Sequence, residues 1–145
     1  MATDQNQYLG NPLLKKANVP VEFTKEQIQE YQKCMDDPVY FIQEYMKIVS
    51  LDEGLVPFKM YDFQRNMVKT FHDNRFTICK LPRQSGKSTT IIAYLLHYVL
   101  FNPNVNVAIL ANKSSTARDI LGRLQLGYEN LPKWLQQGVI SWNKG

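Results

Sequence analysis

Carboxylates are scarce in the second half of this 145-residue chain. Residues 75–145 carry nine lysines and arginines against two acidic residues, Asp119 and Glu129, whereas residues 1–74 carry eight against eleven. The formal net charge of +4 therefore divides into −3 for the first part and +7 for the second. A basic half of this kind indicates a polyanionic partner, a nucleotide or a nucleic acid, although a merely solvated basic face remains open on charge alone.

Cysteine, histidine and long apolar runs are also rare. Cys34 and Cys79 have no second Cys or His at a metal-ligand spacing, so the sequence favours neither a disulfide nor a zinc site. His72 and His97 are isolated, and we interpret them as packing or surface residues rather than catalysts. No apolar run approaches the roughly 20 residues of a membrane span, and the first seven residues are polar. We therefore expect a soluble, intracellular protein with no membrane partner. Its 145 residues suit one domain, and a hydrophobic content of 44% is enough for a core.

One motif in the basic half predicts a chemistry. Gly86, Lys87 and Ser88 form the GK[S/T] end of a phosphate-binding loop. In such a loop, backbone N–H groups face the β- and γ-phosphates, the lysine adds a positive charge, and the Ser or Thr hydroxyl binds Mg²⁺. Leu81 stands where the full pattern GxxxxGK[S/T] has its first glycine, so a surface turn with a solvated lysine is the alternative, and the context must decide.

The context favours the phosphate loop. Residues 76–80 read as a buried strand, and the apolar spacing after the loop predicts a helix from Lys87 to Phe101 that ends at Asn102-Pro103. Residues 105–110 then read as a second strand, parallel to the first. We therefore expect an α/β fold, a P-loop NTPase-type parallel sheet with flanking helices, with residues 111–115 at the carboxyl edge where such sheets bind ligands.

The rest of the chain is expected to support this unit. Residues 1–22 read as a flexible arm, and residues 23–145 as the domain, which begins with a helical segment. The further elements that we predict are helices from the Thr24 capping box to Met35, from Asp37-Pro38 through Ile48, from Asp62 to His72 and from Ser114 or Ser115 to about Asn130, an acidic loop over 50–58 and a short strand over 139–142.

Gln64 is a candidate for base recognition. Phe63, Met67 and Phe71 share one predicted helix face, so we expect Gln64 to lie off that face. An amide can pair with the donor and acceptor edge of adenine. A plain surface glutamine is the alternative that composition favours.

Taken together, these motifs resemble those of the large terminase subunit of contractile-tailed bacteriophages. The resemblance extends from about Asn11 to Gly145, and terminases of this kind resemble one another in having a degenerate loop of the form [S/P]RQxGK[S/T]. The segments that carry it are Tyr61-Asp62-Phe63-Gln64, residues 81–89, residues 107–113, residues 36–41 and residues 131–145.

The resemblance implies the amino-terminal part of an ATPase that packages DNA. A homo-oligomeric ring of such subunits, in the cytoplasm of the host bacterium and transiently on the procapsid, uses ATP and Mg²⁺ to drive duplex DNA through the viral portal, together with a small terminase subunit. By position, Lys87 and Arg83 would be catalytic, and Ser88 would hold the metal. The nucleotide would be bound by Phe63, Gln64, Gln84, Ser85, Gly86, Lys87, Ser88 and Thr89.

The chain departs from the family in one respect, because no Asp-Glu pair follows Lys87. In the family, the second Mg²⁺ carboxylate, the water-activating glutamate and the nuclease domain lie downstream, so hydrolysis by these 145 residues alone should be negligible. Three accounts of the short length fit this departure: the chain is a sequence fragment, a truncated form, or half of a split gene that is completed in trans. Two other functions stay open: the first lobe of a superfamily 2 helicase or translocase, and a nonhydrolysing nucleotide-binding assembly module.

Overall fold

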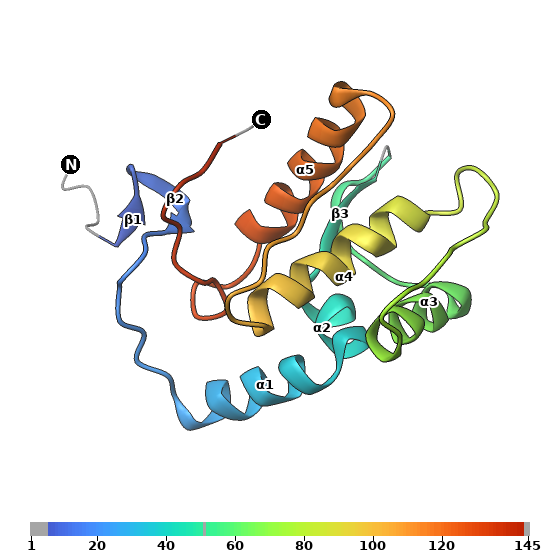
Figure 1. The fold of residues 1–145 in the computed structure, drawn as a ribbon. Coiled ribbons are helices and arrows are strands. Elements are labelled where there is room, and N and C mark those ends of the chain that lie inside the picture. Colours follow the sequence, from blue (N-terminus) through green and yellow to red (C-terminus); the bar gives the residue numbers. More distant parts are fainter. Residues whose placement is uncertain (1–5, 51, 144–145) are drawn as a thin grey trace.

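Helix α4 (Lys87–Phe101) lies at the centre of the molecule, and the other helices pack around it (Figure 1). In this computed structural model, which describes residues 6–50 and 52–143, α4 contacts α2 (Pro38–Tyr45), α3 (Asp62–Asp73) and α5 (Ser114–Glu129), while α1 (Lys25–Asp36) packs on α2. The largest fully buried apolar side chains are Leu14, Phe41, Ile42, Val68, Ile92, Leu96 and Leu135. No helix within the described part of the chain is long and apolar enough to cross a membrane.

Local capping signals set the starts of α1 and α2, as predicted. The Oγ1 of Thr24 accepts a hydrogen bond from the backbone N–H of Gln27 at 3.2 Å, and the Gln27 side chain accepts one from the Thr24 N–H at 3.1 Å. Asp37 caps the N–H groups of Val39 and Tyr40 in the same way. The predicted spans of α3 and α4 are also confirmed. Each signal lies within four residues of the helix end that it sets, so the sequence alone reveals it.

Three local predictions are wrong. The second helix ends at Tyr45 rather than running through Ile48, because residues 47–50 form strand β3 (Lys47–Ser50). Strand β3 pairs antiparallel with β4 (Gly54–Pro57), where the sequence suggested an acidic loop. The β-branched residues Ile48, Val49 and Val56 suit this half-exposed hairpin. The N-cap of α5 is Lys113 without a side-chain hydrogen bond, so neither Ser114 nor Ser115 caps it.

The fold is a mixture of helices and strands, but both sheets of the described residues are two-stranded and antiparallel. The two segments predicted to be parallel strands, residues 76–80 and 105–110, form no ladder within residues 6–50 and 52–143. They carry exposed apolar side chains, among them Phe76, Ile78 and Leu110. The expected short strand near the C-terminus is reduced to a parallel bridge between Lys16 and Val139.

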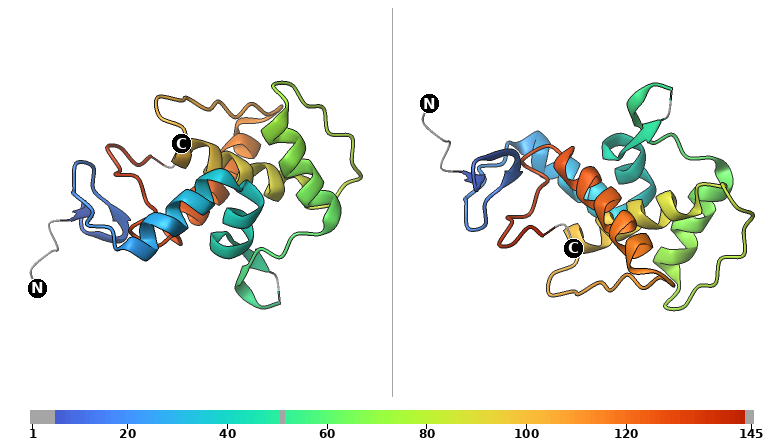
Figure 2. Two further views of the ribbon diagram at one scale, coloured as in Figure 1. Left: turned by 90° about the horizontal axis from the view of Figure 1, so that it is seen from below. Right: turned by 90° about the horizontal axis from the view of Figure 1, so that it is seen from above.

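Residues 1–22 were expected to form a flexible arm. The described part of this segment, residues 6–22, packs against the rest of the protein. Residues 1–5 of that segment lie outside the described residues. Strand β1 (Gln7–Tyr8) pairs with β2 (Asn11–Lys15), and the Leu14 side chain is buried. Both views of Figure 2 show this hairpin beside the C-terminal segment, where Val139 exchanges backbone hydrogen bonds with Lys15 and Ala17 at 2.9 and 3.0 Å.

A buried glutamine joins these two segments. The Oε1 of Gln136 accepts a hydrogen bond from the Lys15 N–H at 3.0 Å. Its Nε2 donates to the carbonyls of Leu13, Tyr128 and Leu131 at 2.9 to 3.2 Å. A buried amide group is stable only when it is paired in this way. Gln136 therefore satisfies backbone groups both of the N-terminal hairpin and of the turn that follows α5.

Candidate functional site

The loop of residues 81–86 leads directly into α4. Gly86 is the N-cap of α4 with φ +75°, and Gln84 also has a positive φ of +61°. The first intrahelical bond runs from the Thr90 N–H to the Gly86 carbonyl at 3.0 Å. The N–H groups of Lys87, Ser88 and Thr89 therefore have no acceptor within the helix. Such an end, with the positive pole of the helix dipole, favours an anion.

The charged and hydroxyl side chains of this loop are available to solvent. The Lys87 Nζ makes one weak hydrogen bond, to the Pro82 carbonyl at 3.4 Å, and Ser85 Oγ donates to the same carbonyl at 3.0 Å. Arg83 and Ser88 are exposed, and Arg83 forms no ion pair within residues 6–50 and 52–143. The loop thus holds two cationic side chains without a carboxylate partner in the described structure, next to three unbonded N–H groups.

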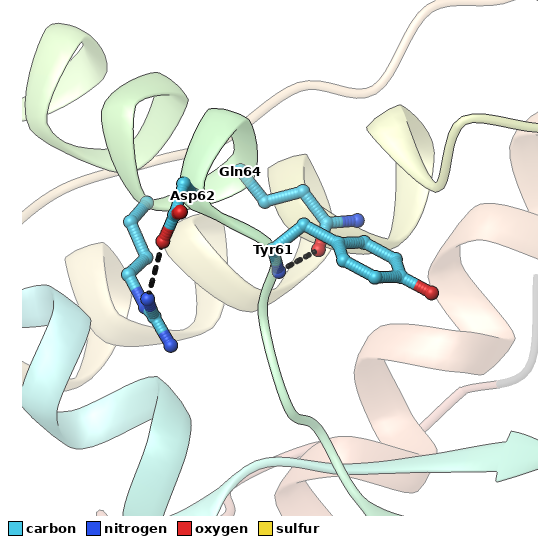
Figure 3. Close-up of polar contacts among 4 residues, drawn as sticks. Tyr61, Asp62 and Gln64 are labelled. Carbon is cyan, nitrogen blue, oxygen red and sulfur yellow. Dashed lines mark hydrogen bonds and ion pairs between the residues drawn. The ribbon is translucent and has the colours of Figure 1, made fainter.

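Gln64 lies against this loop, and the prediction that it points away from the helix's inner face is wrong. Its side chain is 3% exposed, and it shares the buried face of α3 with Met67 and Val68. The Oε1 of Gln64 accepts a hydrogen bond from the Tyr61 N–H at 2.9 Å, as Figure 3 shows, and its Nε2 donates to the Ser85 carbonyl at 3.4 Å. The start of α3 and the loop are therefore linked by one side chain.

Glycine is needed at position 86 for two reasons. Its left-handed backbone disfavours any residue with a Cβ. A Cβ built there would also lie 2.5 Å from the Gln64 Nε2. The position of Gln64 and the shape of the loop thus depend on each other.

Two aromatic rings stand beside Gln64 on the surface. Tyr61 and Phe63 are 70% and 39% exposed, and their rings stack with centroids 5.9 Å apart and an interplanar angle of 9°. The apolar spacing predicts Phe63 on the inner face of α3, whereas the structure leaves it partly in solvent. Tyr61 was not among the predicted site residues, although its place at the N-cap, three residues before Gln64, is a signal that could have indicated it.

Helix α4 is held in place by buried polar contacts as well as by its apolar face. The Thr90 Oγ1 donates to the Gly86 carbonyl at 3.1 Å, and the Tyr94 hydroxyl donates to the Phe71 carbonyl of α3 at 3.3 Å. The His97 Nε2 lies 2.9 Å from the Cys34 carbonyl of α1, while its Nδ1 is buried without a hydrogen bond to any residue that the structure describes. Burial lowers the pKa of His97. His97 is thus a packing residue, as expected, and His72 is exposed.

The first turn of α4 also borders a cavity of about 370 Å³ between β3, α4 and α5. Thr89 and Arg123 supply polar groups to its wall, and Met46, Ile48, Ile92 and Leu126 supply apolar ones. Arg123 pairs with Asp119 at 2.9 Å on the exposed surface of α5. Lys113 and Arg118, at the start of the same helix, are exposed too. The described residues contain no cluster of three or more His, Cys, Asp or Glu side chains that could hold a metal ion.

Comparison with known families supports the identification made from the motifs. Residues 78–145 match the family of the terminase large subunit, T4-like-virus type, N-terminal. The match includes the 81–86 loop, α4 and α5. It begins after Gln64, so the contact between α3 and the loop comes from the structure and not from the match.

Proposed function

Because residues 78–145 match the family of the large terminase subunit of T4-like viruses, we propose that this chain binds ATP and Mg²⁺ in the motor that moves duplex DNA into the capsid. The observation that carries the nucleotide site is the start of α4. There Gly86 leads from the loop into a helix whose first N–H groups have no acceptor within the helix, beside Lys87 and Arg83, which form no ion pair within the described residues. These groups fit a triphosphate, because each is a donor or a positive charge.

Each loop residue has a role in this proposal. The Lys87 ammonium neutralises phosphate charge, the Ser88 hydroxyl binds Mg²⁺, and Arg83 stabilises charge on the γ-phosphate. Gln64 and Phe63 lie on the base side. The backbone around Gln84, Ser85, Gly86 and Thr89 encloses the phosphates. Bound ATP supplies the phosphoanhydride bond, and the carboxylates that orient the attacking water are proposed to come from residues outside this chain.

We also propose that residues 76–80 and 105–110 are strands of a parallel sheet in the complete ATPase. Their exposed side chains support this, since Ile78 is 97% exposed and Leu110 is 89% exposed. The Thr77 Oγ1 is buried without a hydrogen bond in the described residues. Unpaired apolar segments of this kind are favourable sites for strand pairing.

The basic surface of α5 is the proposed contact with DNA. Lys113, at the N-cap of α5, and Arg118 and Arg123, further along the helix, are all exposed. Neutralising the three should weaken DNA binding by the full-length protein and reduce the slope of log K against log salt by up to about three. An unchanged slope would exclude this surface. The further partners in this proposal are the portal, the small terminase subunit and other copies of the chain in a ring, in the cytoplasm of a host bacterium.

The decisive experiment is the Lys87→Ala substitution in the full-length protein. We expect loss of ATP turnover and of DNA filling of empty procapsids, because the charge on the phosphates is removed. Lys69→Ala is the matched control, since Lys69 is an exposed lysine of α3 outside the loop. Retained turnover and filling in Lys87→Ala would refute the proposal. Duplex unwinding without dependence on a portal would indicate a superfamily 2 helicase instead.

A further inference from the structure

A groove lined by two lysines lies between the N-terminal hairpin and the turn that follows α5, and we call it the lysine groove. Its volume is about 480 Å³. Lys15 and Lys133 line it, and neither forms an ion pair within residues 6–50 and 52–143. Glu22 also lies on the wall and has no ionic partner in that part of the chain. The apolar part of the wall consists of Pro12, Leu14, Val19, Pro20, Val21 and Trp134.

The two lysines are partly withdrawn from water. Burial lowers the pKa of both the Lys15 and the Lys133 ammonium groups. A cation that has lost part of its hydration, with no carboxylate at ion-pair distance, is stabilised when a negative charge is placed beside it. Because the rest of the wall is mostly apolar, the lysine groove favours an acidic segment that also carries apolar side chains.

The β3–β4 hairpin of the same chain has this combination of side chains. Val49 and Leu55 are cross-strand partners and therefore lie on one face of the hairpin, where they are 63% and 44% exposed. Asp52 and Glu53, between the two strands, are exposed and form no ion pair with any described residue. Lys47 lies at the opposite end of the ladder from these carboxylates. The hairpin thus presents an acidic tip beside an apolar face.

The hairpin and the lysine groove lie on different sides of the molecule. In both views of Figure 2 the β3–β4 hairpin projects from the helices, away from the N-terminal hairpin that borders the groove. The two surfaces therefore do not meet within one copy, but the hairpin of one copy can reach the groove of another. Contacts between unlike surfaces are heterologous, and they close into a ring when the rotation between copies permits it.

We propose that the β3–β4 hairpin of one copy docks in the lysine groove of a second copy, a contact that rests on the proposed ring of subunits. The carboxylates of Asp52 and Glu53 pair with the two lysines of the groove. The face that carries Val49 and Leu55 covers the apolar wall beside Trp134. Complementary charges of this kind determine which surfaces meet and in which register.

Cross-linking tests this contact in the full-length protein assembled on procapsids. A carbodiimide activates a carboxylate, which then forms an amide with an adjacent amine. Unlabelled protein is mixed with isotope-labelled protein before assembly, so that a link between copies joins peptides of both kinds. We expect mixed links from Asp52 or Glu53 to Lys15 or Lys133. Links between copies that never join these residues, or such links only within one copy, would overturn the proposal.

A charge exchange gives a second test, which does not depend on chemical reactivity. Lys133→Glu and Glu53→Lys should each weaken association of the full-length protein in sedimentation experiments, because each brings like charges together. With both changes in one chain, association should recover, and the coupling should be roughly 2- to 150-fold in the association constant, as for residues in contact. Lys25→Glu, at an exposed lysine of α1 outside the groove, is the matched control and should associate like the parent protein.

The outcomes separate this contact from the proposed function. If copies associate and fill procapsids with DNA, but both single variants behave like the parent protein, the contact is wrong and the proposed motor stands. If the single variants weaken association and the combined variant does not recover, the two residues act independently and the contact is refuted. If the full-length parent protein does not associate, both the contact and the proposed ring are wrong.

Discussion

Replacing Gln136 with leucine tests the connection between the N-terminal hairpin and the rest of the protein. The substitution keeps most of the side-chain volume but removes the hydrogen bond from Lys15 and the donations to three backbone carbonyls. The amide has only two N–H hydrogens for those carbonyls, so about three hydrogen bonds are lost. At about 1 kcal/mol each, with a further cost for buried groups left unpaired, unfolding should become easier by roughly 3 to 5 kcal/mol.

The assay is urea unfolding of the 145-residue chain, followed by tryptophan fluorescence, because Trp134 and Trp142 lie close to Gln136 in the sequence. With a slope of roughly 2 kcal/mol per molar urea, the midpoint should fall by about 1.5 M or more. Hydrogen exchange gives the local result, since the Lys15 amide should lose protection. Gln29→Leu, at an exposed site of α1, is the matched control and should have almost no effect.

A change below about 0.5 kcal/mol for Gln136→Leu, with the Lys15 amide still protected, would refute this reasoning. It would mean that the hairpin does not depend on the amide contacts. Gln136→Glu sharpens the test. A carboxylate would face three carbonyl oxygens, so this variant should be less stable than Gln136→Leu at neutral pH and should recover when acid protonates it.

Gly86→Ala should lower the free energy of unfolding by about 2 to 3 kcal/mol in urea titrations and weaken tripolyphosphate binding, because alanine is strained in the left-handed backbone and its Cβ clashes with the Gln64 amide. Gly122→Ala, where a Cβ meets no atom within 4 Å, should instead stabilise the protein by up to about 1 kcal/mol. The free energy of unfolding should decrease as the pH is lowered from 7.5 to 5, starting near the usual histidine pKa of about 6.5. Burial lowers the pKa of His97 in the folded protein, so the unfolded chain binds more protons in this range. The His97→Gln variant should lack this dependence. Leu14→Ala should cost about 2 to 5 kcal/mol in thermal unfolding, whereas Leu9→Ala, at an exposed position, should have little effect, and equal effects would indicate that the hairpin is not docked.

The helices could be predicted because their signals are local. The Thr24 capping box, Asp37-Pro38 and Asn102-Pro103 each act within one turn of the helix end that they set. The resemblance to terminases is supported by the family match over residues 78–145, because the loop and its flanking segments form a specific ordered pattern. Both conclusions depend on neighbouring residues and on order along the chain, which the sequence contains directly.

The place of Gln64 could not be predicted from hydrophobicity. Hydrophobicity predicts the aromatic Phe63 on the inner face of α3, but Gln64 is buried there instead. Its burial is stabilised by the Ser85 carbonyl, 21 residues away, and by the N-cap of its own helix. The spacing of Gln64, Met67 and Phe71 fits an inner face equally well, so the pattern alone allowed both solutions.

The docked hairpin has a consequence for the order in which the chain can fold during synthesis. Lys15 and its partner Gln136 are 121 residues apart, so the hairpin leaves the ribosome long before its binding surface exists. At translation rates of roughly 5 to 20 residues per second, this interval is about 6 to 24 s. Helices α1 to α4 can associate during that time, whereas the Leu14 side chain remains exposed to solvent or bound to a chaperone. The hairpin is therefore made long before its binding surface and is one of the last parts of the fold to reach its native position.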